Sequence, residues 1–212
     1  FIFATDDTAQ LEVTPGALRV RVVDVLISRQ AVTAAVTNGT FTSDVASWTD
    51  SDEAGAASTW LTGGYLALLG TGTNAAIRDQ QVTVNEASTE HALRIVVQRG
   101  PIILRVGSTA GDDDYIAETT LGTGTHSLAF TPTGNFHIRL MRRRLFTTLV
   151  DSVSIEAAGT MSLSVPWLEA DLSKLRTKQS GDVIYVACTG YQQRKVERRA
   201  TRSWSVVLYE PE

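Results

Sequence analysis

The sequence predicts a mainly β fold, an antiparallel jelly-roll β-sandwich inserted into a small β-rich subdomain with one short helix. Threonine occurs 27 times in 212 residues, and β-branched residues favour strands over helices. Apolar and polar residues alternate in segments such as Leu18–Val22, which is the period of a half-buried strand. Glycine-containing turns separate these segments, and we find no amphipathic helices of the kind a parallel α/β fold requires.

The first part of the chain predicts a short β-meander. Phe1–Phe3, Gln10–Val13 and Leu18–Val22 are expected to be strands, with Pro15 and Gly16 forming the turn between the last two. Neither this segment nor any other contains an apolar run long enough to span a bilayer.

The middle of the chain repeats the same alternation with longer segments. Turn residues such as Gly70–Gly72 and Gly122–Gly124 separate them, and this spacing is typical of an antiparallel sandwich, most simply a jelly roll. The expected strands are Tyr65–Leu69, Ile77–Val84, His91–Gln98, Ile102–Gly107, Thr125–Phe130, Phe136–Met141 and Leu149–Ile155.

The last part of the chain predicts one helix and two strands. Leucines at 168, 172 and 175 have helical spacing, with acidic residues before them and basic residues after, so a helix is expected over residues 168–178. Gly181 ends it. Asp182–Cys188 and Trp204–Leu208 are expected to be strands.

Charge divides the chain into three zones. Residues 37–165 carry eight basic and thirteen acidic side chains, whereas residues 166–212 carry eight basic and six acidic ones. We therefore predict a jelly-roll domain over residues 37–165 and a discontinuous flanking subdomain made of residues 1–36 and 166–212. Residues 1–30 and 166–212 are expected to pair, because neither end alone has enough apolar surface to fold.

Composition excludes several function classes. The net charge of −4 argues against a general nucleic-acid-binding protein. A single cysteine and three histidines without metal-binding spacing argue against zinc sites and disulfides. The chain begins at Phe1 with neither a signal peptide nor a transmembrane segment, so we interpret it as a piece of a longer protein.

Both ends of the chain resemble the tail nozzle proteins (tail tubular protein B) of short-tailed phages and prophages. The resemblance rests on Phe1–Phe3, Leu11–Val13 and Leu18–Val22 at one end, and on Leu172–Tyr185, Tyr191–Lys195 and Thr201–Ser205 at the other. It covers about 80 residues and implies a non-enzymatic virion component. It also implies a homo-oligomeric ring of six tail subunits in the intact parent, with DNA contact only where the protein lines the tail channel.

The middle module resembles the jelly-roll carbohydrate-binding modules of families 4/9 and 22. Val36–Phe41 and Ser47–Thr49 match their opening, and Leu149–Ile155 matches their closing strand. This resemblance implies glycan binding and a structural calcium ion near Asn38, Asp44 and Asp151. Thr42 stands where such modules often carry an acidic ligand, which removes one oxygen donor.

Three aromatic residues, Trp60, Tyr65 and Tyr115, are the candidate carbohydrate-binding residues, because sugar rings stack on aromatic faces. Trp48 is expected instead to plug the sandwich together with Phe41. Asp112–Asp114 has the composition of a cation-binding loop but lacks EF-hand spacing, and a solvated turn is the simpler interpretation.

No catalytic residues are predicted. Glu86, Glu90, Glu118 and Asp151 cannot be placed in a common cleft from sequence, no GxSxG motif is present, and Cys188 is expected to be an inert core thiol. The basic runs Arg142–Arg144 and Arg194–Arg202 fit either phosphate contacts or a solvated, ion-paired face. The alternative function is a free-standing carbohydrate-binding module or an accessory domain of a glycan-active enzyme. The segment Leu172–Trp204 argues against it, because such modules have no need of that segment.

Overall fold

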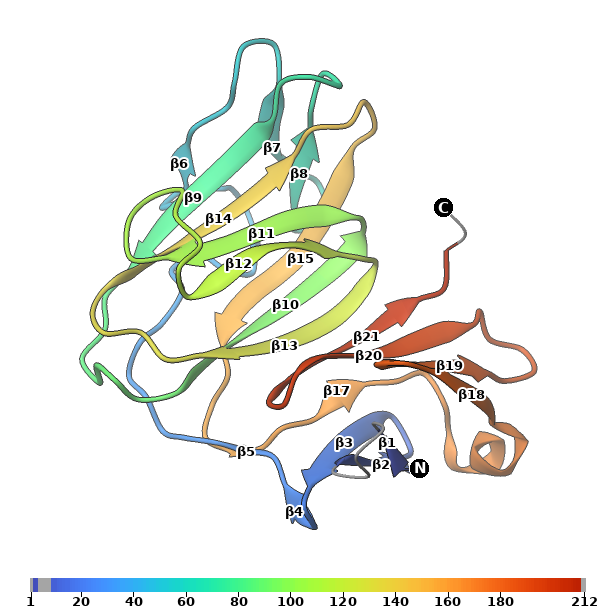
Figure 1. The fold of residues 1–212 in the computed structure, drawn as a ribbon. Coiled ribbons are helices and arrows are strands. Elements are labelled where there is room, and N and C mark those ends of the chain that lie inside the picture. Colours follow the sequence, from blue (N-terminus) through green and yellow to red (C-terminus); the bar gives the residue numbers. More distant parts are fainter. Residues whose placement is uncertain (1, 4–8, 211–212) are drawn as a thin grey trace.

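The computed structural model describes residues 2–3 and 9–210 and is almost entirely β (Figure 1). Phe1, part of the first predicted strand, lies outside the described residues. The prediction of a mainly β, antiparallel sandwich with one short helix is confirmed. The early strands are β1 (Ile2–Phe3), β2 (Ala9–Thr14), β3 (Ala17–Val22), β4 (Val25–Leu26) and β5 (Ser28–Arg29).

The sandwich consists of two facing antiparallel layers. One layer has the order β12-β11-β14-β9-β6 and the other β13-β10-β15-β8-β7, so the chain alternates between layers as in a jelly roll. Their bounds are β6 (Thr49–Asp50), β7 (Ala57–Leu61), β8 (Tyr65–Leu69), β9 (Ala76–Val82), β10 (His91–Arg99), β11 (Ile102–Gly107), β12 (Ile116–Leu121), β13 (Gly124–Phe130), β14 (Phe136–Arg142) and β15 (Thr148–Ile155).

The first core lies between these two layers. Inward-facing side chains of alternating strand positions fill it, among them Leu93 and Ile95 of β10 and Leu104 of β11, all fully buried. The outer face of the β12-β11-β14-β9-β6 layer is polar. Arg139 there donates two hydrogen bonds to Asp79 on the neighbouring strand, at 2.7 and 2.8 Å. This alternation is what the sequence predicted.

The second layer continues beyond the sandwich. β13 pairs with β21 (Ser203–Leu208), and three further strands follow in the order β20 (Arg194–Ala200), β19 (Val183–Ala187) and β18 (Arg176–Ser180). One nine-stranded sheet therefore runs through both the predicted jelly roll and the predicted C-terminal flank. The right-hand strands of Figure 1 form this extension.

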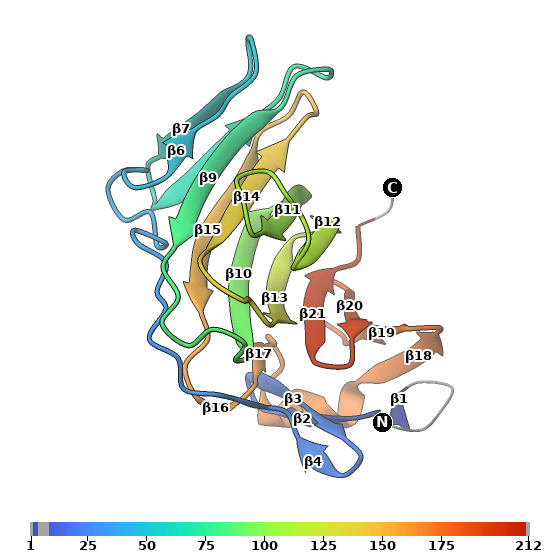
Figure 2. The same cartoon turned by 60° about the vertical axis from the view of Figure 1, so that its left-hand side comes forward.

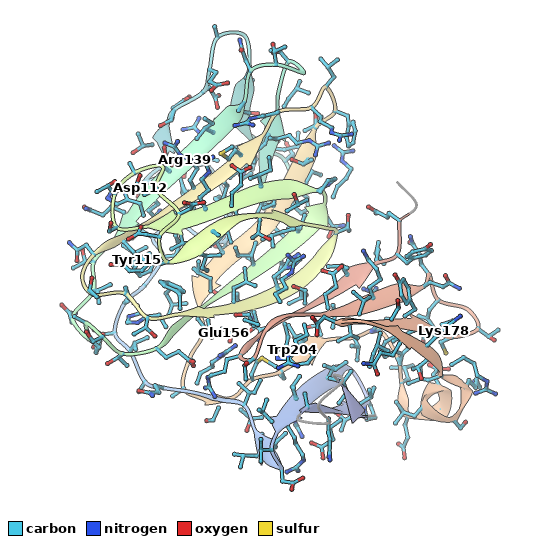
Figure 3. All side chains as sticks on the ribbon, viewed as in Figure 1. Asp112, Tyr115, Arg139, Glu156, Lys178 and Trp204 are labelled. Carbon is cyan, nitrogen blue, oxygen red and sulfur yellow. The ribbon has the colours of Figure 1, made fainter. Side chains whose placement is uncertain are left out.

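The second core lies beneath the extension, against the N-terminal sheet β1-β2-β3-β17, in which β17 is Leu163–Ser164. Figure 3 shows Trp204 between the two sheets, and this side chain is fully buried, as is Trp167. The cluster also contains Leu18 and Val20 of β3 with Ile184 and Val186 of β19. Apolar side chains from the two ends of the chain thus share one core.

Residues 159–165, which the sequence assigns to the sandwich, lie in this second part instead. β16 (Gly159–Thr160) pairs with β5, and β17 pairs with β3. Met161, Leu163 and Val165 occupy alternate positions and are buried in the second core, so this segment packs with the N-terminal sheet.

The predicted helix over residues 168–178 is wrong in length and type. The structure has a short 3-10 helix, η1 (Glu169–Lys174), and residues 176–180 form the edge strand β18. Leu172 and Leu175 are only partly buried against the second core. Arg176–Ser180 is exposed throughout and pairs with β19, and backbone pairing to an apolar strand outweighs the weak helical pattern.

An ion-pair network with a buried centre, the junction network, joins the two parts of the molecule. It consists of Arg29, Glu90, Arg94, Glu156 and Arg202. Arg29 donates to Glu156 at 2.7 Å and to Glu90 at 3.3 Å, and Arg94 pairs with Glu156 at 2.7 Å. Arg202, in the β20–β21 turn, contacts Glu90 at 2.9 Å. Figure 3 shows Glu156 where the sandwich meets the flanking strands. The network ties residues of the linker, the sandwich and the C-terminal hairpin to one another.

Candidate functional site

The loop that opens the sandwich is organised by Asn38. This residue has a left-handed backbone with φ of 47°, and its side-chain amide donates to the carboxylate of Asp44 at 2.7 Å and to the carbonyl of Ala46 at 3.0 Å. The neighbouring Phe41 and Trp48 rings are 5.6 Å apart and both are buried. Trp48 is therefore a sandwich plug, as the sequence indicated.

A shallow, open hollow lies beside this loop at the tip of the β7–β8 hairpin. Its volume is about 420 Å³. The wall combines one carboxylate, three hydroxyl groups and exposed hairpin backbone, and such donors and acceptors suit a polar ligand rich in hydroxyl groups. The lining residues are Thr40, Thr42, Gly63, Gly64, Asp151 and Ser152.

Of the three predicted carbohydrate-binding residues, Tyr65 packs against a residue that lines this hollow. A side chain on Gly63 would contact the Tyr65 ring at 2.8 Å, so the ring packs against the glycine that lines the hollow. Trp60 belongs to the same hairpin but pairs with buried Leu66, whereas Tyr65 pairs with exposed Leu61, so the two rings leave opposite faces of the hairpin.

Trp60 also contributes to the stability of the fold. Its indole N–H donates to the carbonyl of Phe41 at 2.8 Å, and its ring packs against the first core. Tyr115 lies elsewhere, after β11, where its hydroxyl is 2.9 Å from that of Thr133. The three aromatic residues thus do not form one stacking platform.

The three residues predicted to lie near a calcium ion are divided between two places. Asn38 and Asp44 are hydrogen-bonded to each other, with the amide nitrogen rather than the oxygen of Asn38 facing the carboxylate. Asp151 lies in the hollow and accepts a hydrogen bond from Ser152 at 3.1 Å. Within the described residues, no three or more His, Cys, Asp or Glu side chains are arranged to hold a metal ion. Calcium binding at these residues stays a prediction.

The carboxylates of the acidic loop Asp112–Asp114 accept hydrogen bonds from groups in and next to the same loop. Asp114 accepts from the Ser108 amide at 2.7 Å, which holds the pKa of its carboxyl below the usual value. Asp113 accepts from the Glu118 amide at 2.8 Å and Asp112 from the Thr109 hydroxyl at 2.5 Å. These bonds are those of a solvated turn.

The four carboxylates considered for hydrolysis have separate partners. Glu86 is bonded to the amide and hydroxyl of Thr33, and these bonds lower the pKa of its carboxyl, the opposite of what a general acid needs. Glu90 belongs to the junction network, Glu118 pairs with Arg105, and Asp151 lines the hollow.

A buried polar chain around His126 was not predicted. His126 lies 2.8 Å from the hydroxyl of Ser205, which accepts a bond from Arg199 at 2.9 Å. Arg199 also pairs with Glu197 at 2.7 Å and donates to Thr119 at 3.0 Å. Burial lowers the pKa of His126 to about 4. His126 and Ser205 have no exposed surface, so no substrate can reach the Ser205 hydroxyl, and this hydrogen-bonded group of side chains stabilises the fold.

Cys188 and the C-terminal basic run make contacts within the fold. Cys188 is free, buried and part of the second core, as an inert thiol would be. In the run Arg194–Arg202, Lys195 and Arg199 both pair with Glu197, and Arg202 pairs with Glu90. These pairs are internal to the molecule.

The sequence matches no protein-family model, and no curated protein is significantly similar to it. Among the described residues, none of the helices is long and apolar enough to cross a membrane.

Proposed function

We propose that this chain is a non-enzymatic structural component of a phage tail, a nozzle-type scaffold that carries a jelly-roll insert. The observation that supports this proposal is the second core, in which residues 9–27 and 161–206 pack together across the intervening sandwich. A free-standing carbohydrate-binding module needs no such core. A scaffold that must hold a projecting domain rigidly does, and the junction network adds to that rigidity.

The separation of the candidate carboxylates supports the non-enzymatic part of the proposal. Glycoside hydrolysis requires two carboxyl groups on either side of one bond, about 5 to 10 Å apart. Glu90 is held by Arg29 and Arg202, and Glu118 is held by Arg105. Asp151 stands alone in its hollow among hydroxyl groups.

Particle composition tests the tail assignment. Antibodies raised against the purified chain are expected to label the tail of phage or prophage particles from the source organism, with mass spectrometry of the same particles detecting the parent protein. The parent, purified intact, is expected to form a six-membered ring by light scattering. Parent protein found only outside particles, as a monomer, would contradict the proposal.

A second candidate, glycan binding by the insert, is favoured by one feature. The Tyr65 ring packs on Gly63, and Gly63 lines the hollow together with the Asp151 carboxylate and the Thr40 and Thr42 hydroxyls, so an aromatic ring lies one residue away from the hydrogen-bonding groups. Such a pairing suits a sugar ring, whose faces are apolar and whose edge is polar.

A glycan array tests this second candidate. The wild-type chain is expected to retain a defined set of glycans, and both Tyr65→Ala and Asp151→Asn are expected to lose it. Tyr115→Ala is the matched control, because Tyr115 lies far along the chain from the hollow and bonds Thr133. Equal loss in the control, or no glycan bound by the wild type, would exclude binding at the hollow.

A further inference from the structure

The loop between β14 and β15 has an unusual combination of charge and exposure. We call residues 142–146, Arg-Arg-Arg-Leu-Phe, the tip loop. Leu145 is 73% exposed and Phe146 is 54% exposed, while Arg143 and Arg144 are exposed beside them. Although the Phe146 ring packs over Arg142, more than half of each of these two apolar side chains faces water.

Arg142 is the buried member of the tip loop. It is 4% exposed and is the last residue of β14, two positions after Leu140, which is buried in the first core. One terminal nitrogen donates to the carbonyl of Pro101 at 2.7 Å, and the ring of Phe146 covers the guanidinium with 4.4 Å between the guanidinium carbon and the ring centre. Its Nε and Nη2 have no hydrogen-bond partner among the described residues.

Those two nitrogens form one edge of the guanidinium, the edge through which arginine side chains in general bind oxyanions. Nε–H and Nη2–H point in parallel and match two oxygens of a phosphate or carboxylate. A buried guanidinium with this edge unpaired is costly, because desolvation is not offset by hydrogen bonds. An anion approaching through the tip loop would relieve that cost, and Arg143 and Arg144 would attract it.

The tip loop also lies where a partner can reach it. Figures 1 and 2 show the β14–β15 loop at the end of the sandwich away from the N-terminal sheet and the β18–β21 extension. Gly72 donates to the carbonyl of Arg143 at 2.7 Å, so the β8–β9 loop supports the tip loop from one side. Arg99, at the end of β10, is exposed near the same end of the sandwich.

We propose that the tip loop is a docking surface for a lipid bilayer surface that carries anionic phosphate headgroups. Arg143 and Arg144 contact headgroup phosphates, and Leu145 and Phe146 enter the boundary between headgroups and acyl chains. As Phe146 leaves the guanidinium of Arg142, the adjacent and unpaired Nε and Nη2 donors become available to a phosphate. The exposed apolar apex favours lipid over nucleic acid, which would offer the arginines phosphates but leave Leu145 and Phe146 in water.

Sedimentation with vesicles tests this proposal, which does not depend on the proposed tail function. The intact chain is expected to bind vesicles of phosphatidylcholine with phosphatidylglycerol and to bind phosphatidylcholine alone much more weakly. The double variant Arg143→Ser/Arg144→Ser is expected to bind the anionic vesicles about thirtyfold more weakly, at about tenfold per 1.4 kcal/mol and about 1 kcal/mol per basic residue. Leu145→Ser/Phe146→Ser is also expected to weaken binding.

The matched control is Arg176→Ser/Lys178→Ser. It removes the same charge from the exposed strand β18, at the other end of the nine-stranded sheet, and is expected to bind as the wild type does. Equal loss in this control would reduce the effect to net charge and overturn the proposal. So would binding to duplex DNA without binding to anionic vesicles, or full vesicle binding by the Leu145→Ser/Phe146→Ser variant.

Arg142 requires its own variant. Arg142→Met keeps an unbranched, largely apolar side chain and removes the unpaired donors together with the bond to Pro101, so the variant is expected to fold, with a melting temperature close to that of the wild type. Its binding to anionic vesicles is expected to fall while its small affinity for phosphatidylcholine is unchanged. If a folded Arg142→Met chain bound anionic vesicles like the wild type, the role assigned to Arg142 would be wrong.

Discussion

At the scale of single residues, Gly39 shows how closely the opening loop approaches the closing strand. A side-chain carbon at Gly39 would lie 2.0 Å from the carbonyl oxygen of Val153, and the two backbones are joined by a 2.7 Å hydrogen bond. The Asn38–Gly39 pair is therefore needed for close approach as well as for the turn.

Gly39→Ala is accordingly expected to destabilise the sandwich by about 2 to 4 kcal/mol, because the backbone of the opening loop would have to move away from that of β15. Gly134→Ala is the control, since a side chain there meets nothing within 4 Å. Urea unfolding monitored by tryptophan fluorescence measures both. Similar stabilities for the two variants would show that the loop can move away from β15.

His126 gives the molecule a predictable pH dependence. Its pKa is lowered from 6.5 to about 4 by burial, so between these values the unfolded chain binds a proton that the folded chain does not. The corresponding stability is fully present above pH 6.5, is lost as the pH falls toward 4, and amounts to on the order of 3 kcal/mol.

Unfolding at pH 7 and pH 5 tests this. The wild type is expected to lose stability over this interval, and His126→Gln to lose less, since glutamine can both donate and accept a hydrogen bond without titrating. If His126→Gln lost as much unfolding free energy between pH 7 and pH 5 as the wild type does, the pH dependence would belong to other groups.

At the scale of elements, the junction network holds the linker, the sandwich and the C-terminal hairpin together. Glu156→Gln removes the charge that pairs with Arg29 and Arg94 in a site where Arg29 is almost fully buried. The expected loss of stability is about 3 kcal/mol, because buried Arg29 loses its shorter ion pair and keeps only the 3.3 Å pair with Glu90. Glu118→Gln breaks an exposed pair with Arg105 and is expected to cost about 1 kcal/mol or less. Chemical unfolding of both variants makes the comparison, and equal losses would contradict the claimed burial of the network.

The elements that sequence reasoning predicted are those with strong alternation. Tyr65–Leu69 and Ile102–Gly107 agree with the structure to the residue, because their apolar faces are buried in the first core. β12, β18 and β20 were missed, because polar side chains dominate them and backbone pairing with neighbouring strands decides their conformation. The helix over 168–178 failed for the same reason.

At the scale of the whole molecule, sequence could predict a sandwich but not how its surface groups meet. The hollow unites Asp151 with the Gly63–Gly64 turn, although almost 90 residues separate them in the chain. The junction network likewise joins Arg29 to Glu156, and no local pattern marks either residue. Trp48 was predictable because its role is local, next to Phe41 in the same loop.

The central claim is that the two ends of the chain form one core and one continuous sheet across the sandwich. Hydrogen exchange of the full chain carrying Val20→Asp tests it most directly, because Val20 is fully buried in the second core, where an unpaired charge is not tolerated. Faster amide exchange is expected not only in Ala17–Val22 but also in Val183–Ala187 and Arg194–Ala200, with Ile102–Gly107 and Phe136–Arg142 as protected as in the wild type. Unchanged protection in Val183–Ala187 and Arg194–Ala200, with loss confined to Ala17–Val22, would contradict a shared core.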